Sequence, residues 1–271
     1  MTIVPVIYDL PESEYHARTE LSTHQLMHML RSPAAFRHAI DHPEVPTPAM
    51  VQGSCLHIAA LEPDRYAEAV AVMPEGMIRR GGAWNEFRDG NIGREILTAA
   101  ADAEVKLWRA ALLADATIAN AISTSQHEVS LFWTDEETGV DMRARLDMLR
   151  LWRDAGRAIV DDIKTCADAS PEAMQYEIDD RNYDMQAWVY SEAVRHVYGL
   201  DDVAFWLNCV EKSEPYQTVR YEIGAEGMAV GRAKYRAALS AYVAALDSGV
   251  WEGYKSGVIA PALWTLKKWG L

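Results

Sequence analysis

The chain has 271 residues, of which 49% are hydrophobic and 24% are charged, values typical of a globular protein with a sizeable core. No apolar run approaches the ~18 residues of a membrane span, and the first residues lack the basic stretch of a secretory signal. The three scattered cysteines have no CxxC spacing, which argues against a disulfide framework, a zinc site and an iron–sulfur cluster. A reducing cytoplasm is therefore the expected compartment. The formal net charge of −14 is unusual for a DNA-binding protein, although net charge does not describe a local site.

The N-terminal part, residues 1–125, is predicted to be mainly helical after an extended lead-in over residues 1–20. Ser22 is a good N-cap, and Gln25 stands where a capping box requires it. The helix that begins there should end before Pro33. Further helices are predicted at residues 34–41, 49–61 and 96–121.

The helix over residues 49–61 carries a single histidine, His57, in a largely apolar stretch. A lone histidine of this kind is more often a satisfied core residue than a metal ligand. An imidazole beside two carboxylates is also a sensible ligand for Mg²⁺ or Mn²⁺. The residues alone leave both interpretations open.

Residues 74–94 are rich in glycine and locally basic. Arg79, Arg80 and Arg88 could grip a phosphate backbone, and Trp84 could stack on a base. The glycines before Trp84 predict a mobile loop that leads into a short helix. The alternative is a surface loop with a buried tryptophan as its anchor.

Three consecutive antiparallel strands are predicted over residues 127–133, 140–151 and 157–164. Turns that contain Gly139 and Gly156 separate them. Side chains alternate between the two faces of a strand. We therefore expect Met142, Ala144, Leu146 and Met148 on one face of the second strand, and Arg143, Arg145 and Asp147 on the other.

Alternation along the third strand places Asp162 and Lys164 on the same face and Asp161 on the opposite face. Asp147 lies near the end of the neighbouring strand. Two carboxylates can hold Mg²⁺ through hard oxygen ligands, and a nearby lysine can orient a water or stabilise charge on a phosphate. This set is what metal-assisted phosphodiester hydrolysis needs. The Asp-x-Lys tripeptide is also common on ordinary surface strands.

Glu128, on the first of these strands, could be a simple partner of Arg143 or Arg145. After the third strand, Ser170 caps a helix, and a longer helix is predicted over residues 183–198. Gln186 and Tyr190 lie four residues apart on one face of that helix, where they could support a phosphate or a carboxylate. Strands are predicted at residues 202–210 and 216–223, a helix at 226–247, and an aromatic-rich tail at 251–271.

The order of these elements predicts an α/β fold, or α+β by a stricter count, with a mixed sheet of about five strands between helices. We expect residues 1–271 to form a single domain. It would contain a helical part over 1–125, a sheet and catalytic core over 126–223, and a helix with a tail over 224–271.

Five segments, in this order, resemble the PD-(D/E)xK nucleases, and specifically the nuclease domain of RecE-type exodeoxyribonuclease VIII, a relative of lambda exonuclease. They are GSCLHIAALEP at 53–63, HEVSLFW at 127–133, TGVDMRARLDML at 138–149, IVDDIKT at 159–165 and YDMQAWVY at 183–190. The family's usual proline is replaced, since Leu146 precedes Asp147. Because the aspartate is the residue that binds metal, this departure is minor.

The resemblance implies a restriction-endonuclease-like core and a role for each matched residue. Asp147, Asp162, His57 and the carbonyl of Ile163 would bind metal, with Glu128 near them. Lys164 would position the attacking water, and Gln186 and Tyr190 would support the site.

The implied function is a Mg²⁺-dependent exonuclease, with Mn²⁺ as a substitute metal, that degrades one strand of duplex DNA from the 5′ end for recombination. The resemblance also implies a ring of three or four subunits, duplex DNA ends as substrate, a single-strand annealing recombinase as partner, and a phage or prophage source in a bacterial host cell. Two alternatives stay open: a catalytically silent DNA-end-binding or assembly protein, and an endonuclease or Cas4-like enzyme without an iron–sulfur cluster.

Overall fold

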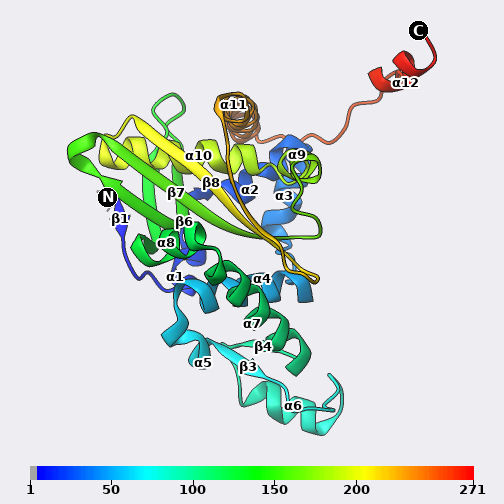
Figure 1. Ribbon diagram of the computed structural model, residues 1–271. Coiled ribbons are helices and arrows are strands. Elements are labelled where there is room, and N and C mark those ends of the chain that lie inside the picture. The colour runs from blue at the N-terminus through cyan, green and yellow to red at the C-terminus, as the bar shows by residue number, and fades with distance from the viewer. Residues whose placement is uncertain (1–4) are drawn as a thin grey trace.

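The computed structural model describes residues 5–271 and has a mixed seven-stranded sheet at its centre (Figure 1). The main path of this sheet is β1-β5-β6-β7-β8-β9, and β2 pairs with β6 outside that path. Only β7–β8 and β2–β6 are parallel pairs within it. The strands are β1 Val6–Ile7, β2 Leu21–Ser22, β5 Gln126–Thr134, β6 Asp141–Trp152, β7 Arg157–Cys166, β8 Asp202–Glu211 and β9 Thr218–Glu222.

The five longer strands, β5 to β9, are the five that the sequence predicts, and the α/β fold with helices on both faces is confirmed. The tight connection from β6 to β7 passes through Gly156, whose φ of 64° lies in the left-handed region that glycine adopts without steric cost. The parallel pairing of β7 with β8 requires a crossover connection. Helices α9 Pro171–Asp180 and α10 Tyr183–Tyr198 form this crossover.

One face of the sheet packs against α10, α11 Ala225–Ser248, and the N-terminal helices α2 Thr23–Met27 and α3 Pro33–Asp41. α11 lies very close to α10, since a Cβ atom on Gly231 would stand 2.0 Å from the carbonyl oxygen of Asp184. α2 begins with the predicted capping box: Ser22 Oγ accepts from the amide of Gln25, and Gln25 Oε1 accepts from the amide of Ser22. Before α3 the N-terminal part also contains α1 Glu12–Ala17 and a 3₁₀ turn at His28–Leu30.

The other face carries a second hydrophobic cluster built by α4 Pro48–Leu61, α7 Ala99–Ala114 and α8 Ala116–Thr124. Beyond α4 lies a small lobe in which β3 Val70–Val72 pairs in parallel with β4 Glu95–Leu97. This lobe also contains α5 Tyr66–Ala69 and α6 Gly82–Asp89 (Figure 1). No helix within residues 5–271 combines the length and the apolar character that crossing a membrane requires.

The sequence did not predict the short strands. Residues 1–20, predicted as a lead-in, contain β1 and α1, and the stretch around residue 74–94 is flanked by β3 and β4. A strand of two or three residues is too short to show alternation, so its existence depends on the partner strand rather than on its own side chains.

The predicted face of Met148 is wrong. Leu146 and Leu149 both belong to the cluster under α10, whereas Met148 belongs to the cluster under α4. Two side chains three residues apart thus share a face, which strict alternation forbids. The alternation is broken at Asp147, opposite Glu128, whose φ of 51° is rare for a residue with a side chain.

Candidate active site

Helix α4 brings His57 against the middle of β7. The Nε2 atom of His57 lies 3.0 Å from the carbonyl oxygen of Ile163, and its Nδ1 atom lies 3.6 Å from Asp147 Oδ2. Burial lowers the pKa of His57, but the nearby carboxylates of Asp147 and Asp162 outweigh burial and raise it. The imidazole therefore stands between an acid and a carbonyl, the same two groups that the sequence predicts as metal ligands.

Asp147 occupies the point where β6 and β7 separate. Their backbone pairing runs from Trp152 and Arg157 as far as Met148 and Asp161, and no further pair follows. Beyond it, Asp147 Oδ2 accepts a hydrogen bond of 2.9 Å from the amide of Ile163. The side chain thus replaces a strand hydrogen bond, which holds one carboxylate oxygen beside the Ile163 backbone and leaves the other available.

Glu128 lies opposite Asp147 on β5, at the residue with positive φ. His57, Glu128 and Asp147 each offer a ligand atom, and these three atoms all lie within 4.8 Å of one another. Burial, and then the charge of Asp147, raises the pKa of Glu128 to about 8. The guanidinium of Arg145 is 3.9 Å from Glu128, so both sequence interpretations of this acid describe its surroundings.

Asp162 and Lys164 share a face of β7, as alternation predicts, with Lys164 Nζ 2.6 Å from Asp162 Oδ2. Gln186, on the first turn of α10, donates a hydrogen bond of 2.7 Å to Asp162 Oδ1. Burial, and then Asp147, raises the pKa of Asp162 to about 6. Burial alone would lower the pKa of Lys164, but Asp162 and Asp147 outweigh it and raise it above its ordinary value. Lys164 is therefore held as an ammonium ion.

Tyr190 lies one turn beyond Gln186 and packs its ring edge-on against Phe205, with the ring centroids 6.2 Å apart. Burial raises the pKa of its hydroxyl well above the ordinary value, although a hydrogen bond with Gln186 works in the opposite direction. Tyr190 is thus a buried hydroxyl beside Gln186 and near the carboxylates of Asp162 and Asp147.

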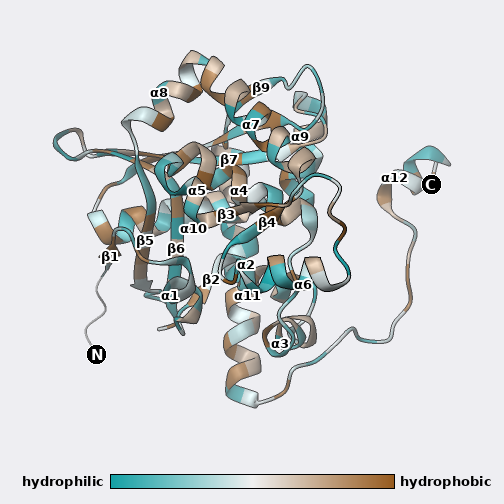
Figure 2. Ribbon diagram, turned by 90° about the horizontal axis from the view of Figure 1, so that it is seen from below, coloured by the Kyte–Doolittle hydropathy of each residue, from teal (hydrophilic) through white to brown (hydrophobic). Residues whose placement is uncertain are grey.

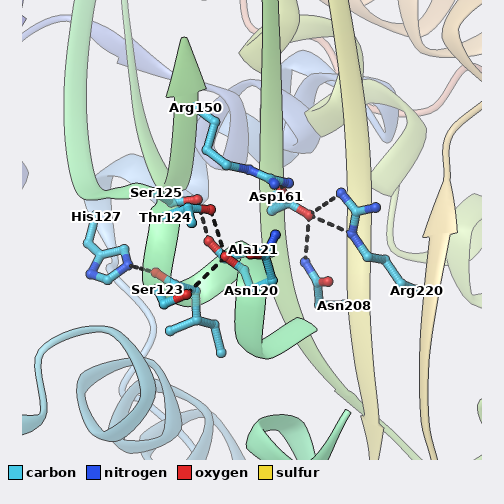
Figure 3. A network of polar contacts seen from close by, with 11 residues as sticks. Asn120, Ala121, Ser123, Thr124, Ser125, His127, Arg150, Asp161, Asn208 and Arg220 are labelled. Atoms are coloured by element: carbon cyan, nitrogen blue, oxygen red, sulfur yellow. Dashed lines mark hydrogen bonds and ion pairs between the residues drawn. The ribbon is translucent and has the colours of Figure 1, made fainter. Parts of the chain in front are cut away.

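Asp161, the neighbour of Asp162, points to the other face of the sheet (Figure 3). There its carboxylate accepts hydrogen bonds from Arg150 at 2.6 Å, from Asn208 at 3.1 Å, and from Arg220 at 2.7 and 2.9 Å. Both of its oxygens are thus occupied by protein donors. It is not part of the cluster around His57, in agreement with the face that alternation assigns to it.

The residues around His57 fit a divalent cation. Asp147 lies near two further carboxylates, Glu128 and Asp162, and the cationic side chains beside them are Lys164 and Arg145. Burial, and then the charge of Asp147, raises the pKa of both Glu128 and Asp162, so a bound cation would favour their ionised forms. Carboxylate and carbonyl oxygens with one imidazole are suitable ligands for Mg²⁺ or Mn²⁺.

Comparison with known proteins supports the same interpretation. The profile of the PDDEXK-like domain family of unknown function (DUF3799) matches residues 22–260, which is most of the chain. The chain belongs to this PDDEXK-like family. The search of curated proteins found no match.

Among solved structures, the crystal structure of a candidate exonuclease from Eubacterium rectale matches with a TM-score of 0.65 and 11% identity, over 96% of this chain and 98% of that chain. At this identity the match shows the fold alone, which is restriction-endonuclease-like. The structure of SSO0001 matches with a TM-score of 0.39 and 13% identity, over 86% of this chain and 81% of that chain, too weakly to carry an argument. The PDDEXK-like family and the fold support a nuclease, a hydrolase of phosphodiester bonds that uses a divalent metal.

The basic residues predicted to bind DNA lie in the small lobe, away from the cluster. Arg79 donates to the carbonyl of Ile96 at 2.8 Å, and its guanidinium lies 5.7 Å from the centre of the Trp84 ring. Arg80 and Arg88 are exposed: Arg80 precedes α6, and Arg88 lies in its last turn and pairs with Asp89. Trp84 is half-buried, so the lobe has features of both the DNA-contact and the anchor interpretations.

The structure places two further residues at the site, Tyr183 and Arg145, which the sequence analysis did not predict as functional. Lys164 Nζ lies 4.9 Å from the centre of the Tyr183 ring, which covers it at the start of α10. Tyr183 precedes Gln186 by three residues, so the same helical spacing that selected Gln186 could have selected it. Arg145, which faces Glu128, was considered only as a structural partner. Arg145 lies close to Glu128 only because β5 pairs with β6, and the sequence alone does not give the register of that pairing.

Proposed function

We propose that this protein is a Mg²⁺-dependent exodeoxyribonuclease that degrades one strand of linear duplex DNA from 5′ to 3′. The observation that carries the nuclease chemistry is the convergence of Asp147, Asp162 and Lys164 with His57 at the point where β6 and β7 separate. The direction of digestion and the supply of single-stranded tails for recombination rest on the resemblance to RecE-type enzymes.

In this proposal, Asp147, Asp162, Glu128, His57 and the Ile163 carbonyl hold the metal. A bound Mg²⁺ would supply Lewis-acid polarisation of the scissile phosphate and a lowered pKa of a bound water. Their placement on three strands, β5, β6 and β7, and on the packed helix α4 keeps these ligands fixed before substrate arrives.

Lys164 has a distinct role because its pKa is raised. An ammonium ion cannot accept a proton from water, so Lys164 donates hydrogen bonds to the attacking water or to the phosphate oxygens on which charge develops. Gln186 keeps Asp162 in place, and Tyr190 orients Gln186. The presence of all these groups in contact distance argues against a catalytically silent protein.

We further propose that residues 1–271 act as one domain in the cytoplasm of a bacterial host cell, as the product of a phage or prophage. The enzyme would work as a ring of three or four subunits on duplex ends, beside a single-strand annealing recombinase. In a ring, Arg79, Arg80, Trp84 and Arg88 would contact DNA, which would reconcile DNA binding with a net charge of −14.

The test is digestion of a linear duplex labelled at either the 5′ or the 3′ end, with Mg²⁺ or with EDTA, by the wild type and by Lys164→Ala. The proposal predicts Mg²⁺-dependent release of the 5′ label and its loss in the variant. A closed circular duplex should stay intact, and nicking of the circle would identify an endonuclease. Equal activity of Lys164→Ala, or no activity with any divalent metal, would contradict the proposed site.

A further inference from the structure

The last part of the chain, residues 253–271, leaves the body of the molecule from a fixed point. Trp251 stacks on Phe36 with ring centroids 5.5 Å apart, and the amide of Ala34 donates to the carbonyl of Glu252 at 3.0 Å. Every residue from Glu252 to Trp264 is exposed. The segment ends in α12 Leu263–Lys268, which stands apart from the body in both ribbon views (Figures 1 and 2). We call residues 253–271 the tail.

The tail presents an unusual density of exposed apolar side chains. Seven of them are between 70% and 102% exposed: Tyr254, Val258, Ile259, Leu263, Trp264, Trp269 and Leu271. Large exposed apolar patches mark interaction sites. The only charged side chains of the tail are three lysines, so it carries +3, whereas the remaining residues of this −14 chain carry −17. The tail therefore combines large aromatic and aliphatic side chains with a few lysines, and its aromatic side chains are what a docking site would bind.

The body has a groove with a volume of about 440 Å³ between α10, the start of α11 and β8, where aromatic, apolar and guanidinium groups meet. Ala204 and Met228 contribute apolar walls, and Glu222 contributes an acid. The Trp188 ring has the guanidinium of Arg195 5.4 Å from its centre and that of Arg232 5.5 Å from it. Within residues 5–271, the buried Trp188 Nε1 has no hydrogen-bond partner, and the tryptophan itself is only half-buried at the groove wall.

The groove and the point where the tail departs lie at opposite ends of α11. Met228 precedes Ser248 by 20 residues, which is about 30 Å along the helix axis. The ten residue-to-residue steps from Gly253 to Leu263 span at most about 35 Å when fully extended. A tail docked in its own groove would have to run back almost straight along α11, whereas the tail in Figure 1 leads away from the body.

We propose that the tail of one copy docks in the groove of a second copy of this chain. Trp264 or Trp269 would enter beside Trp188 and the two arginines, where aromatic and guanidinium groups stack favourably. A lysine of α12 would pair with Glu222. The contact joins different surfaces on the two copies, so repetition gives either a closed ring or an open chain.

The assembly test uses the full chain in native mass spectrometry at micromolar concentration. The double variant Trp264→Ser with Trp269→Ser removes the docking side chains of the tail. Ala229→Trp fills the groove from an exposed position on α11. Trp152→Ser, at a tryptophan that is 44% exposed on β6, is the matched control. Each test variant should raise the dissociation constant of the assembly at least about tenfold, and the control should leave it unchanged. A monomeric wild type, or tail variants that assemble like the wild type, would overturn the proposal.

Crosslinking then identifies the occupant of the groove. The photoreactive residue p-benzoylphenylalanine replaces Trp264 in a mixture of heavy-isotope-labelled and unlabelled copies, with and without duplex DNA. The proposal predicts mixed-isotope peptide pairs that join residue 264 to peptides from 203–204 or 222–232. Pairs within one copy would place the tail in its own groove. Crosslinks to DNA, or to other parts of the second copy, would equally overturn the assignment.

Discussion

Asp161 and Asp162 are adjacent in the chain and both buried, yet their surroundings differ in charge. Asp161 faces two arginines and an asparagine, which occupy both of its oxygens and leave that side of β7 with excess positive charge. Asp162 lies near Asp147, whose charge raises its pKa, and its direct partners are one lysine and the amide of Gln186. A carboxylate whose charge the protein balances supports the fold, whereas carboxylates that repel one another leave room for a cation.

The sharpest contrast is expected in catalysis. Asp162→Asn removes a proposed metal ligand, so duplex digestion should fall by about 10³-fold. Its effect on stability should be smaller than that of Asp161→Asn, because the lost pair with Lys164 is offset by reduced repulsion with Asp147. Rates from the labelled duplex and melting temperatures of both variants check this. Comparable activity of Asp162→Asn and the wild type would show that Asp162 is not a required metal ligand and would contradict the contrast with Asp161.

The reverse contrast is expected in stability. Asp161→Asn leaves Arg150 and Arg220 without a counter-charge in a buried setting, which should lower the free energy of unfolding by about 3 to 5 kcal/mol. Urea denaturation measures this loss. Arg157→Ala, which removes an exposed pair with Asp202, should change it by less than about 1 kcal/mol and serves as the control. An unfolding free energy of Asp161→Asn equal to that of the wild type would show that the arginine cluster is not a structural support.

The acidic side also predicts a dependence on pH. The pKa of Glu128 is raised to about 8 and that of Asp162 to about 6, so the folded protein keeps protons that the unfolded chain has released. The stability of the metal-free protein should therefore fall as pH rises from about 4.5 to 8. The raised pKa of His57 acts in the same direction, since its stabilising charge is lost as pH rises.

Melting temperatures in EDTA and in Mg²⁺ at pH 5, 6.5 and 8.5 test this dependence. The increase in melting temperature caused by Mg²⁺ should grow with pH, because the metal competes with protons for the same groups. Glu128→Gln should weaken the dependence in EDTA. A melting temperature in EDTA that rises across the window would contradict the charges assigned to the cluster.

The smallest effect is expected from the arginines of the small lobe. Arg80→Ala should weaken duplex binding by a few-fold and lower the slope of log affinity against log salt by about 1, if Arg80 contacts one phosphate. Fluorescence anisotropy over a series of salt concentrations measures both. Arg157→Ala, on the exposed start of β7, is the control and should change neither quantity. A salt slope unchanged by Arg80→Ala would count against the lobe as a DNA contact.

The pairing of Asp162 with Lys164, and the separation of both from Asp161, follow from strand alternation, which the sequence of β7 shows clearly. The place of Met148 does not follow, because the alternation of β6 breaks at Asp147 and no residue type announces that break. The proximity of His57 to Ile163 depends on how α4 packs on the sheet. Only the resemblance to a known family indicated it, since spacing along the chain carries no information about packing between distant segments.

The central claim is that Asp147, Glu128, Asp162 and His57 hold a divalent cation. Anomalous X-ray scattering from crystals grown with Mn²⁺ tests it without relying on activity. The account predicts a manganese peak between His57, Asp147 and the carbonyl of Ile163, and its loss in Asp147→Asn. A peak on the Asp161 side of β7, or no peak in the cluster at a Mn²⁺ concentration that supports digestion, would contradict it.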